Sequence, residues 1–175
     1  MTMPIVSIRD AVSADARELG EVFRRSSLSN EGDREALLSH PEVLEFDAAA
    51  VQEQRVRVAV VDGRIVGFAT LLATGCAGVL EDLFVDPDWM LHGIGRALVL
   101  DAVGTARRQG LTRIDVTANP HALGFYENVG FLADGMTETA FGPGHRMTLP
   151  IPPEPTCATP AQTWSTRRSS STKAS

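Results

Sequence analysis

The chain has 175 residues, of which 43% are apolar and 22% charged, a composition that suits a single soluble globular domain with a sizeable core. Its formal net charge of −6 argues against nucleic acid as a partner and mildly favours a cationic or amine acceptor, although solubility alone explains it equally well. No apolar run is long enough to cross a bilayer and no signal-peptide layout opens the chain, so we expect a cytoplasmic protein with no membrane partner.

The N-terminal part of the chain predicts one strand and two helices. Residues 5–9 alternate apolar with polar side chains, as a half-buried strand does. Ser13 or Asp15 can cap a helix whose apolar positions share one face, namely Ala16, Leu19, Val22 and Phe23. A second helical stretch, about residues 33–39, ends where Pro41 interrupts it. A helical pattern can resume after this proline.

The central part predicts three successive antiparallel strands. Residues 55–61 and 64–74 are rich in β-branched and apolar side chains, and they flank Asp62-Gly63, a strong two-residue hairpin signal. Gly67 lies inside the second strand, which predicts a bulge or a close backbone approach at this position. Residues 79–85 form the third strand.

The C-terminal part adds strands over 113–118, 131–136 and 145–149, with a short helix over 121–128. The order of elements is mixed, which predicts an α/β fold with a twisted mixed sheet and helices on both faces. The domain is expected to span 1–151. A Pro-, Ser- and Thr-rich tail over 152–175 has too few apolar residues to order itself.

Two further expectations concern assembly and metals. An exposed edge strand near the C-terminal end of the domain would allow a homodimer. The two cysteines, Cys76 and Cys157, have no metal-type spacing and predict free thiols. The four histidines are scattered along the sequence, so we expect no metal cofactor.

The most informative stretch is 79–109, a strand, a turn with a proline, a loop with two glycines and a long amphipathic helix. Gly93 and Gly95 leave the first helical amides unpaired beside the positive end of the helix dipole, an arrangement that binds phosphate. Leu98 stands where a dinucleotide motif needs its third glycine, and no G-K-[ST] is present. The stretch therefore predicts a pyrophosphate cradle without metal chemistry, although taken alone it would favour a turn that binds nothing.

Two motifs resemble the GNAT superfamily of N-acetyltransferases. Residues 83–87 match the family's strand end, L-x-V-x-P, and Gly93-Ile94-Gly95 matches its loop, [QR]-x-x-G-x-[GA]. Residues 119–131 fill every position of the family's N-x-x-A-x-x-F-Y-x-x-x-G-F signature. Together the motifs and the element order cover about residues 5 to 149. The first motif departs from the family at Met90, where Gln or Arg is usual, and at Leu91 and His92, where many members have Gly and Arg.

The resemblance implies an acyl-CoA N-acyltransferase fold, mostly antiparallel, in which the parallel strands over 79–85 and 113–118 splay apart and admit the pantetheine arm of acetyl-CoA. Because backbone amides are present whatever the side chains, the altered loop is expected to weaken binding rather than abolish it. The positions that the resemblance assigns to acetyl-CoA are Leu83, Phe84, Val85, Met90, Leu91, His92, Gly93, Ile94, Gly95, Arg96, Asn119 and Tyr126.

Two residues are the candidates for catalysis. Tyr126, the one tyrosine of the chain, stands where the family places the hydroxyl that protonates the departing thiolate; the alternative is a core aromatic side chain. Glu81 is a candidate base, with an ion-paired strand carboxylate or deprotonation by water as equal alternatives. Strand alternation predicts Glu81 on the face of Leu83 and Val85, with Asp82 on the opposite face.

These motifs favour an N-acetyltransferase that moves acetyl from acetyl-CoA to a primary amine by direct attack, because no Cys or Ser is placed to accept the acyl group. Residues 26–54 match no motif, so the acceptor, a small-molecule or peptide amine, stays open. The alternatives are an acyltransferase for longer acyl-CoA and a catalytically silent CoA-binding sensor or interaction module.

Overall fold

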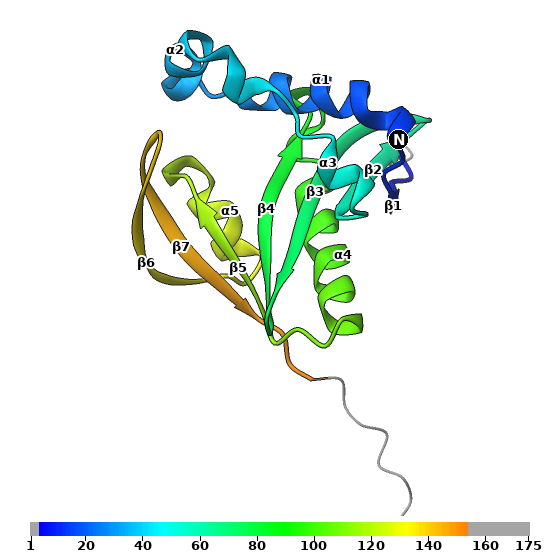
Figure 1. The fold of residues 1–175 in the computed structure, drawn as a ribbon, viewed down its shortest axis with the longest axis vertical. Helices are drawn as coiled ribbons and strands as arrows, with labels where there is room; N and C mark the ends of the chain where they lie inside the picture. The colour runs from blue at the N-terminus through cyan, green and yellow to red at the C-terminus, as the bar shows by residue number, and fades with distance from the viewer. Residues whose placement is uncertain (1–3, 154–175) are drawn as a thin grey trace, which may run out of the picture.

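A seven-stranded sheet forms the centre of the molecule, and the computed structural model describes residues 4–153 (Figure 1). The strand order is β1-β2-β3-β4-β5-β7-β6, and every neighbouring pair is antiparallel except β4 and β5. The strands are β1 Ser7–Asp10, β2 Val56–Val61, β3 Arg64–Thr74, β4 Ala77–Val85, β5 Arg113–Ala118, β6 Leu132–Thr139 and β7 Gly142–Pro150. The predicted mixed sheet with a single parallel pair is therefore confirmed.

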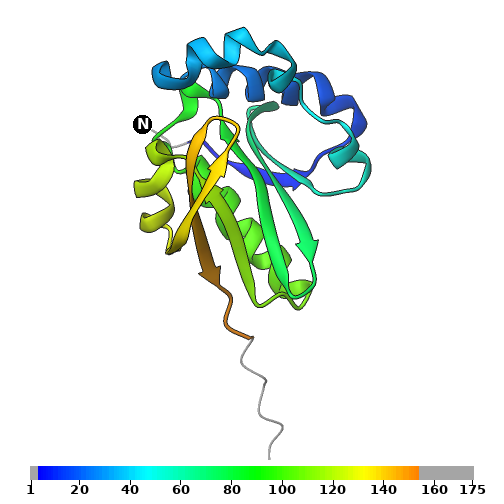
Figure 2. The ribbon, with the colours of Figure 1, turned by 60° about the vertical axis from the view of Figure 1, so that its left-hand side comes forward.

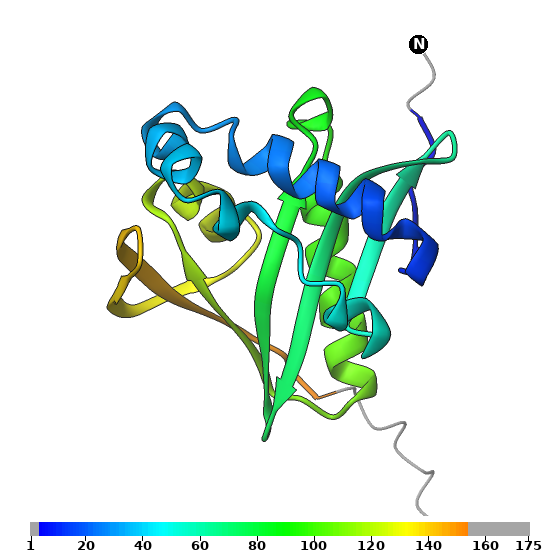
Figure 3. The same ribbon diagram turned by 45° about the horizontal axis from the view of Figure 1, so that its top comes forward.

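Helices cover both faces of this sheet, with α1 in front of it and α4 behind it in Figure 3. The α-helices are α1 Ala16–Ser27, α2 Glu31–Ser39, α3 Ala49–Gln52, α4 Ile94–Arg108 and α5 Leu123–Asn128. Short 3-10 turns are η1 Ser13–Asp15, η2 Pro41–Leu44, η3 Pro87–Trp89 and η4 Pro120–Ala122. After Pro41 the chain forms the turn η2 instead of resuming an α-helix. The four-residue α3 was not predicted, because so short a segment has no periodicity.

The sheet separates two apolar cores. On the α4 face, Leu98 and Ala102 of the helix belong to one buried cluster with strand residues such as Leu80 of β4 and Ile114 of β5. On the α1 face, the helix buries Leu19 and Val22 against Val58 and Phe68. Alternating side chains of the central strands supply both cores, so this sheet is buried on each side.

The hairpin between β2 and β3 turns at the predicted dipeptide. Asp62 and Gly63 have φ values of 49° and 78°, the left-handed pair that a type I′ turn requires. Both expectations for Gly67 are confirmed. The register slips by one residue beside it, since Ala59 pairs with Gly67 but Val60 pairs with Ile65. A Cβ on Gly67 would also lie 2.9 Å from the carbonyl oxygen of Phe84.

The Gly67→Ala variant is expected to lose about 2 kcal/mol of unfolding free energy, because overpacking a buried site costs roughly this much. The new methyl group would meet the Phe84 carbonyl at 2.9 Å and Ile94 Cγ2 at 3.1 Å. Gly20→Ala is the matched control, because a Cβ on this α1 residue meets nothing within 4 Å and alanine favours helix. Urea titration should show the two variants shifting in opposite directions; equal midpoints would contradict the packing argument.

The parallel pair is short and opens into a gap. β4 pairs with β5 only over Ala77–Val79 and Arg113–Asp115, after which the strands separate. Figure 1 shows them meeting at the lower end of the sheet and diverging upward. In Figures 1 and 2, α1 and α2 lie over the end where the strands are apart. A Cβ on Gly32 of α2 would lie 3.5 Å from His121 Nε2 at the start of the second motif, so α2 reaches across this end.

The remaining expectations concern the cysteines, the C-terminal tail and membrane-spanning helices. Cys76 is an exposed free thiol, as predicted, whereas Cys157 lies outside residues 4–153. Ile151 is buried and its amide donates to the carbonyl of Thr112, which anchors the chain after β7. The predicted tail, apart from its first two residues, also lies outside the described part, so the domain division stays a prediction. No helix within residues 4–153 has the length and apolarity to cross a membrane.

Candidate active site

The first turn of α4 presents free backbone donors. Gly93 caps the helix with φ 78° and no side-chain bond, and the first helical hydrogen bond runs from Ala97 N to the Gly93 carbonyl. The amides of Ile94, Gly95 and Arg96 precede this bond and therefore have no acceptor within the helix. The Ile94 side chain is buried, so a ligand can reach this residue only through its backbone, whereas Arg96 is exposed. The geometry fits the predicted phosphate site.

The loop before α4 differs from the family pattern in chemistry and in strain. Leu91 has φ 63° and a fully exposed side chain, so a branched residue occupies a left-handed position that glycine adopts without strain. His92 Nδ1 donates to the carbonyl of Met90 at 2.7 Å, which leaves Nε2 of the neutral ring as an acceptor. A neutral His92 in this position cannot donate to a phosphate through Nε2.

The Leu91→Gly variant is expected to be more stable by about 0.5 kcal/mol, the difference between the relieved left-handed strain and the added entropy of the unfolded glycine. No buried contact is lost, because the leucine side chain is exposed. Thermal unfolding would measure the gain. The control is Leu100→Gly, since Leu100 is also exposed but lies inside α4, where glycine costs about 1 kcal/mol. A loss of stability in Leu91→Gly would show that the loop is not strained.

The two sequence motifs meet at the start of α4. A Cβ on Gly95 would lie 3.1 Å from the ring of Phe125, so the missing side chain lets α5 pack against the first turn of α4. Asn119 Oδ1 accepts the amide of Ala122 at 2.8 Å, so this side chain caps the turn η4. A further bond from Asn119 to the pantetheine arm stays a prediction.

Tyr126 has a buried ring, and its hydroxyl, which is not fully enclosed, makes no hydrogen bond within residues 4–153. The side chain is 7% exposed, and its ring makes edge contacts with Phe125 and Phe131 at centroid distances of 5.2 Å. Burial raises the pKa of Tyr126 to about 12, and the charge of Asp82 adds to this effect. The phenol therefore stays protonated at neutral pH, with its proton available to a ligand in the gap.

One edge of β4 is open along the gap. Leu83, Phe84 and Val85 pair with β3 on one side, but the ladder to β5 ends at Val79. Their groups on the β5 side are consequently available to an extended ligand, which could pair with them as an added strand. This edge runs from the phosphate site toward the level of Glu81.

A β-bulge at Glu81 corrects the predicted faces of β4. Thr70 pairs with Asp82 and Leu71 with Leu80, so Glu81 is the extra residue and the alternation is interrupted there. The expectation that Glu81 and Asp82 point to opposite faces is wrong, because both line one cavity on the α1 face. The reason is that a bulge shifts the period of two by one residue.

The two carboxylates nevertheless differ in their partners. Glu81 forms an ion pair with Arg55, which also binds Glu53. Asp82 has no salt bridge among the described residues, and desolvation by burial raises its pKa. The Thr70 hydroxyl opposite it partly offsets this rise, and the charge of Glu81 reinforces it. The Thr70 oxygen itself is buried without a partner of normal hydrogen-bond geometry. Asp82, which the sequence had placed away from the site, is therefore the better-placed proton acceptor.

A cavity of about 280 Å³ lies beside these carboxylates, and its other walls come from α1, α3, the residue just before β2 and the segment between η2 and α3. The complete lining is Phe23, Glu45, Phe46, Asp47, Ala50, Arg55, Glu81 and Asp82. Sequence reasoning missed this cavity apart from the β4 residues. No motif marks the remaining residues, which come from distant segments, and the charge of residues 42–47 was the one available hint.

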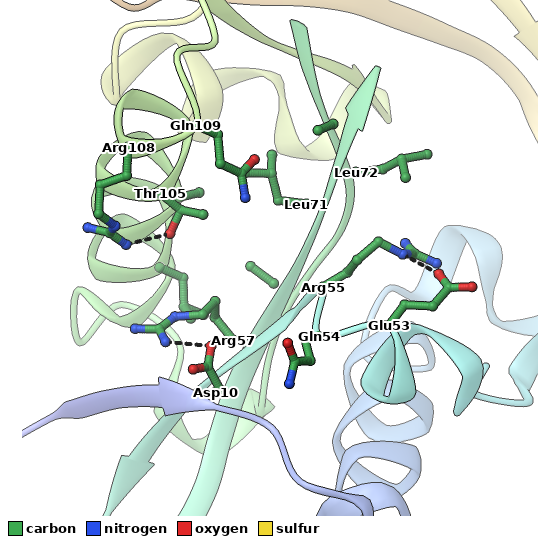
Figure 4. Close-up of a pocket in the computed structure, with 14 residues that line it drawn as sticks. Asp10, Glu53, Gln54, Arg55, Arg57, Leu71, Leu72, Thr105, Arg108 and Gln109 are labelled. Carbon is green, nitrogen blue, oxygen red and sulfur yellow. Dashed lines mark hydrogen bonds and ion pairs between the residues drawn. The ribbon is translucent and has the colours of Figure 1, made fainter. Parts of the chain in front are cut away.

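A larger cavity of about 490 Å³ lies between β3 and the C-terminal half of α4 (Figure 4). Its arginines are mostly satisfied by carboxylates: Arg57 binds Asp10 and Asp101, and Arg55 binds Glu53. None of the residues that the sequence assigned to catalysis or to acetyl-CoA lines it. Arg55 borders both cavities, but the larger one is separate from the start of α4 and from the gap between β4 and β5. Within residues 4–153 no group of three His, Cys, Asp or Glu side chains is arranged to hold a metal ion.

Comparison with known proteins shows the family to which this chain belongs. The model of the Acetyltransferase (GNAT) family matches residues 19–131. Glucosamine 6-phosphate N-acetyltransferase of Trypanosoma brucei brucei is 30% identical over 139 residues, which cover 71% of this chain and 92% of that protein. A peptidyl-lysine N-acetyltransferase of Salmonella typhimurium is 33% identical over 135 residues, 77% of this chain and 88% of that protein.

A similar fold is found among solved structures. The crystal structure of the PaiA N-acetyltransferase from Thermoplasma acidophilum, in complex with coenzyme A, aligns with a TM-score of 0.69 and 19% identity. The alignment covers 83% of this chain and 99% of that one. At this identity the likeness concerns the fold, and it confirms the arrangement of sheet and helices that the sequence predicted.

Proposed function

Because the chain belongs to the GNAT family of acetyltransferases, we propose that it moves the acetyl group of acetyl-CoA directly to the primary amine of an acceptor. The observation that carries this proposal is Tyr126, whose phenol stays protonated and lies near enough to β4 for the charge of Asp82 to raise its pKa. Its hydroxyl makes no hydrogen bond within residues 4–153 and is not fully enclosed, so it is free to protonate a departing thiolate.

The chain can hold acetyl-CoA along one continuous track. The amides of Ile94, Gly95 and Arg96 would bind the pyrophosphate, which also relieves the unfavourable charge of Arg96 at the positive end of the α4 dipole. The open edge of β4 at Leu83–Val85 would pair with the amide groups of the pantetheine arm. Backbone amides along this edge are the available donors for polarising the thioester carbonyl.

The acceptor amine would enter from the cavity on the α1 face. Acetyl-CoA supplies an activated acyl group, and the amine must be neutral to attack it. Asp82 would take the ammonium proton, since its raised pKa makes it a better base than an ion-paired carboxylate. The amine nitrogen then bonds to the acyl carbon while the carbon–sulfur bond breaks, and Tyr126 donates its proton to the sulfur. The nitrogen loses its second proton to the Tyr126 phenolate, directly or through water, which leaves a neutral amide and restores the phenol. Glu81, held by Arg55, would shape the cavity and support Asp82 electrostatically.

Release of free CoA thiol on mixing the protein with acetyl-CoA and a panel of primary amines tests this proposal. We expect release that depends on the amine and is absent when the amine is omitted. In parallel, acetyl-CoA should raise the melting temperature by mass action. A thermal shift without release for any amine would favour a silent CoA-binding module. Absence of both would mean that the altered loop at Met90–His92 does not bind the cosubstrate.

A further inference from the structure

The cavity on the α1 face is lined mainly by acidic side chains, and this lining favours cationic acceptors over anionic ones. Its lining carries four carboxylates, Glu45, Asp47, Glu81 and Asp82, against one cation, Arg55. That cation is already engaged by Glu81 and by Glu53, which lies just outside the cavity. An anionic group of an acceptor would have to break these pairs to reach the guanidinium. The cavity therefore repels carboxylates and phosphates and attracts cations.

The carboxylates lie at two places in the cavity. Glu81 and Asp82 belong to β4, beside the gap in which transfer would take place, whereas Glu45 and Asp47 belong to the segment between η2 and α3. Neither Glu45 nor Asp47 forms an ion pair within residues 4–153, and both are exposed. Asp47 is nonetheless close enough to Asp82 for its charge to raise the pKa of that carboxyl. The lining of the cavity thus carries negative charge both on β4 and on the segment between η2 and α3.

Two half-buried aromatic rings belong to the same wall. The centroids of Phe23 and Phe46 lie 6.5 Å apart in an edge arrangement, and Phe46 also contacts Phe68 at 5.3 Å. Such rings offer apolar surface to an aliphatic chain and negative faces to an ammonium group. At about 280 Å³ the cavity is at the lower end of the range for small ligands, roughly 300 to 1,000 Å³. Its size fits a short chain better than a folded substrate.

A second observation points to a ligand in addition to the acidic lining. The Thr70 hydroxyl is wholly buried, has no hydrogen-bond partner and faces Asp82 across the β3–β4 ladder. Asp82 forms no salt bridge within residues 4–153, and the charge of Arg55 offsets only part of the rise in its pKa that burial causes. A cation beside Asp82 would neutralise this carboxylate, and the threonine hydroxyl could complete its hydrogen bonds.

We propose that the acceptor is a small aliphatic diamine, with one amine placed at Asp82 for acetylation and the second, charged ammonium held by Glu45 and Asp47. This assignment deepens the proposed function and rests on it. In the reaction Asp82 takes a proton from the first ammonium, the new nitrogen–carbon bond forms, the carbon–sulfur bond breaks and the thiolate receives the Tyr126 proton. The nitrogen then gives its second proton to the Tyr126 phenolate, directly or through water. The second ammonium keeps its charge throughout, and the aliphatic spacer lies against Phe23 and Phe46.

The test compares amines that differ mainly in the group at the far end. The probes are 1,4-diaminobutane, n-butylamine, 4-aminobutanoate and glucosamine 6-phosphate, with CoA thiol release as the readout. We expect kcat/KM for the diamine to exceed that for butylamine by about 10-fold, which is the attraction of two exposed carboxylates for one ammonium. The two anionic amines should be poorer than butylamine. A lysine-containing peptide separates a protein acceptor from a free diamine, and a kcat/KM above that of the diamine would overturn the proposal.

Variants of Glu45 and Asp47 test whether these two carboxylates hold the second ammonium. Asp47→Asn keeps the acceptor oxygen that binds the Ala49 amide, and Glu45→Gln removes a charge that has no ion-pair partner in the described chain. Each should lower the diamine-to-butylamine ratio of kcat/KM by about 3-fold, and this ratio is the readout because the charge of Asp47 also acts on the pKa of Asp82. Glu35→Gln, an exposed acidic position on α2 outside the cavity, should leave the ratio unchanged. Equal turnover of butylamine and diamine would overturn the diamine assignment alone, whereas no turnover of any amine would overturn the acetyltransferase proposal with it.

Discussion

The Tyr126→Phe variant is expected to lose about 100-fold in kcat, the usual contribution of a positioned general acid. The ring contacts with Phe125 and Phe131 do not involve the hydroxyl, so the variant should fold as the native chain does. Removing a hydroxyl that makes no hydrogen bond within residues 4–153 should leave stability nearly unchanged. Steady-state thiol release, with KM for acetyl-CoA measured beside kcat, checks the expectation.

The split between kcat and KM separates chemistry from binding. A side chain that acts only on the departing thiolate lowers kcat without changing the affinity for acetyl-CoA. The thermal shift produced by acetyl-CoA should therefore match that of the native chain. If kcat is unaffected and only the melting temperature moves, Tyr126 is a core aromatic residue and the leaving group takes its proton from water.

Residues 119–131 show what could be predicted from sequence. Asn119 and Tyr126 occur in this dense signature, and in the structure Asn119 caps a turn and the ring of Tyr126 is buried. The hairpin at Asp62-Gly63 and the strand over 64–74 also came from local rules, because turn chemistry and a run of apolar and β-branched residues act over a few neighbouring positions.

The acceptor side could not be predicted, for two physical reasons. A bulge is a slip between two strands, and nothing in the residues of β4 alone marks Glu81 as the extra one. The cavity walls meet only through tertiary packing, since Phe23 and Arg55 are far from Asp82 in the chain. Gly95 shows a subtler limit. Its role in the phosphate loop was expected, but its contact with Phe125 links the two motifs and depends on the folded position of α5.

The Asp82→Asn variant is expected to lose about 100-fold in kcat/KM near neutral pH, because an amide cannot take the ammonium proton. The loss should shrink as pH rises, since more of the amine is then neutral without a base. A pH–rate profile measures this, and a merely structural role for Asp82 would not produce it. Glu81→Gln is the matched control on the adjacent residue of the strand. Its loss should be smaller, because Arg55 already holds that carboxylate; a larger loss would return the role of base to Glu81.

The same Asp82→Asn substitution should stabilise the fold at neutral pH by about 1 kcal/mol, the cost of a buried carboxylate without a cation. The folded pKa of Asp82 lies above its ordinary value of 3.8, so the folded state binds this proton more tightly than the unfolded state. The stability of the native chain therefore falls as pH rises from 3.8 through the folded pKa, and the penalty is complete above it. Asparagine does not titrate, so the advantage of the variant should be present at pH 7 and disappear below the ordinary carboxyl value. Urea titrations of both chains at acidic and neutral pH would show this.

A gain in stability joined to a loss of activity is expected where an unfavourably buried charge is kept for chemistry. A variant that loses stability at pH 7 would instead identify Asp82 as a structural residue.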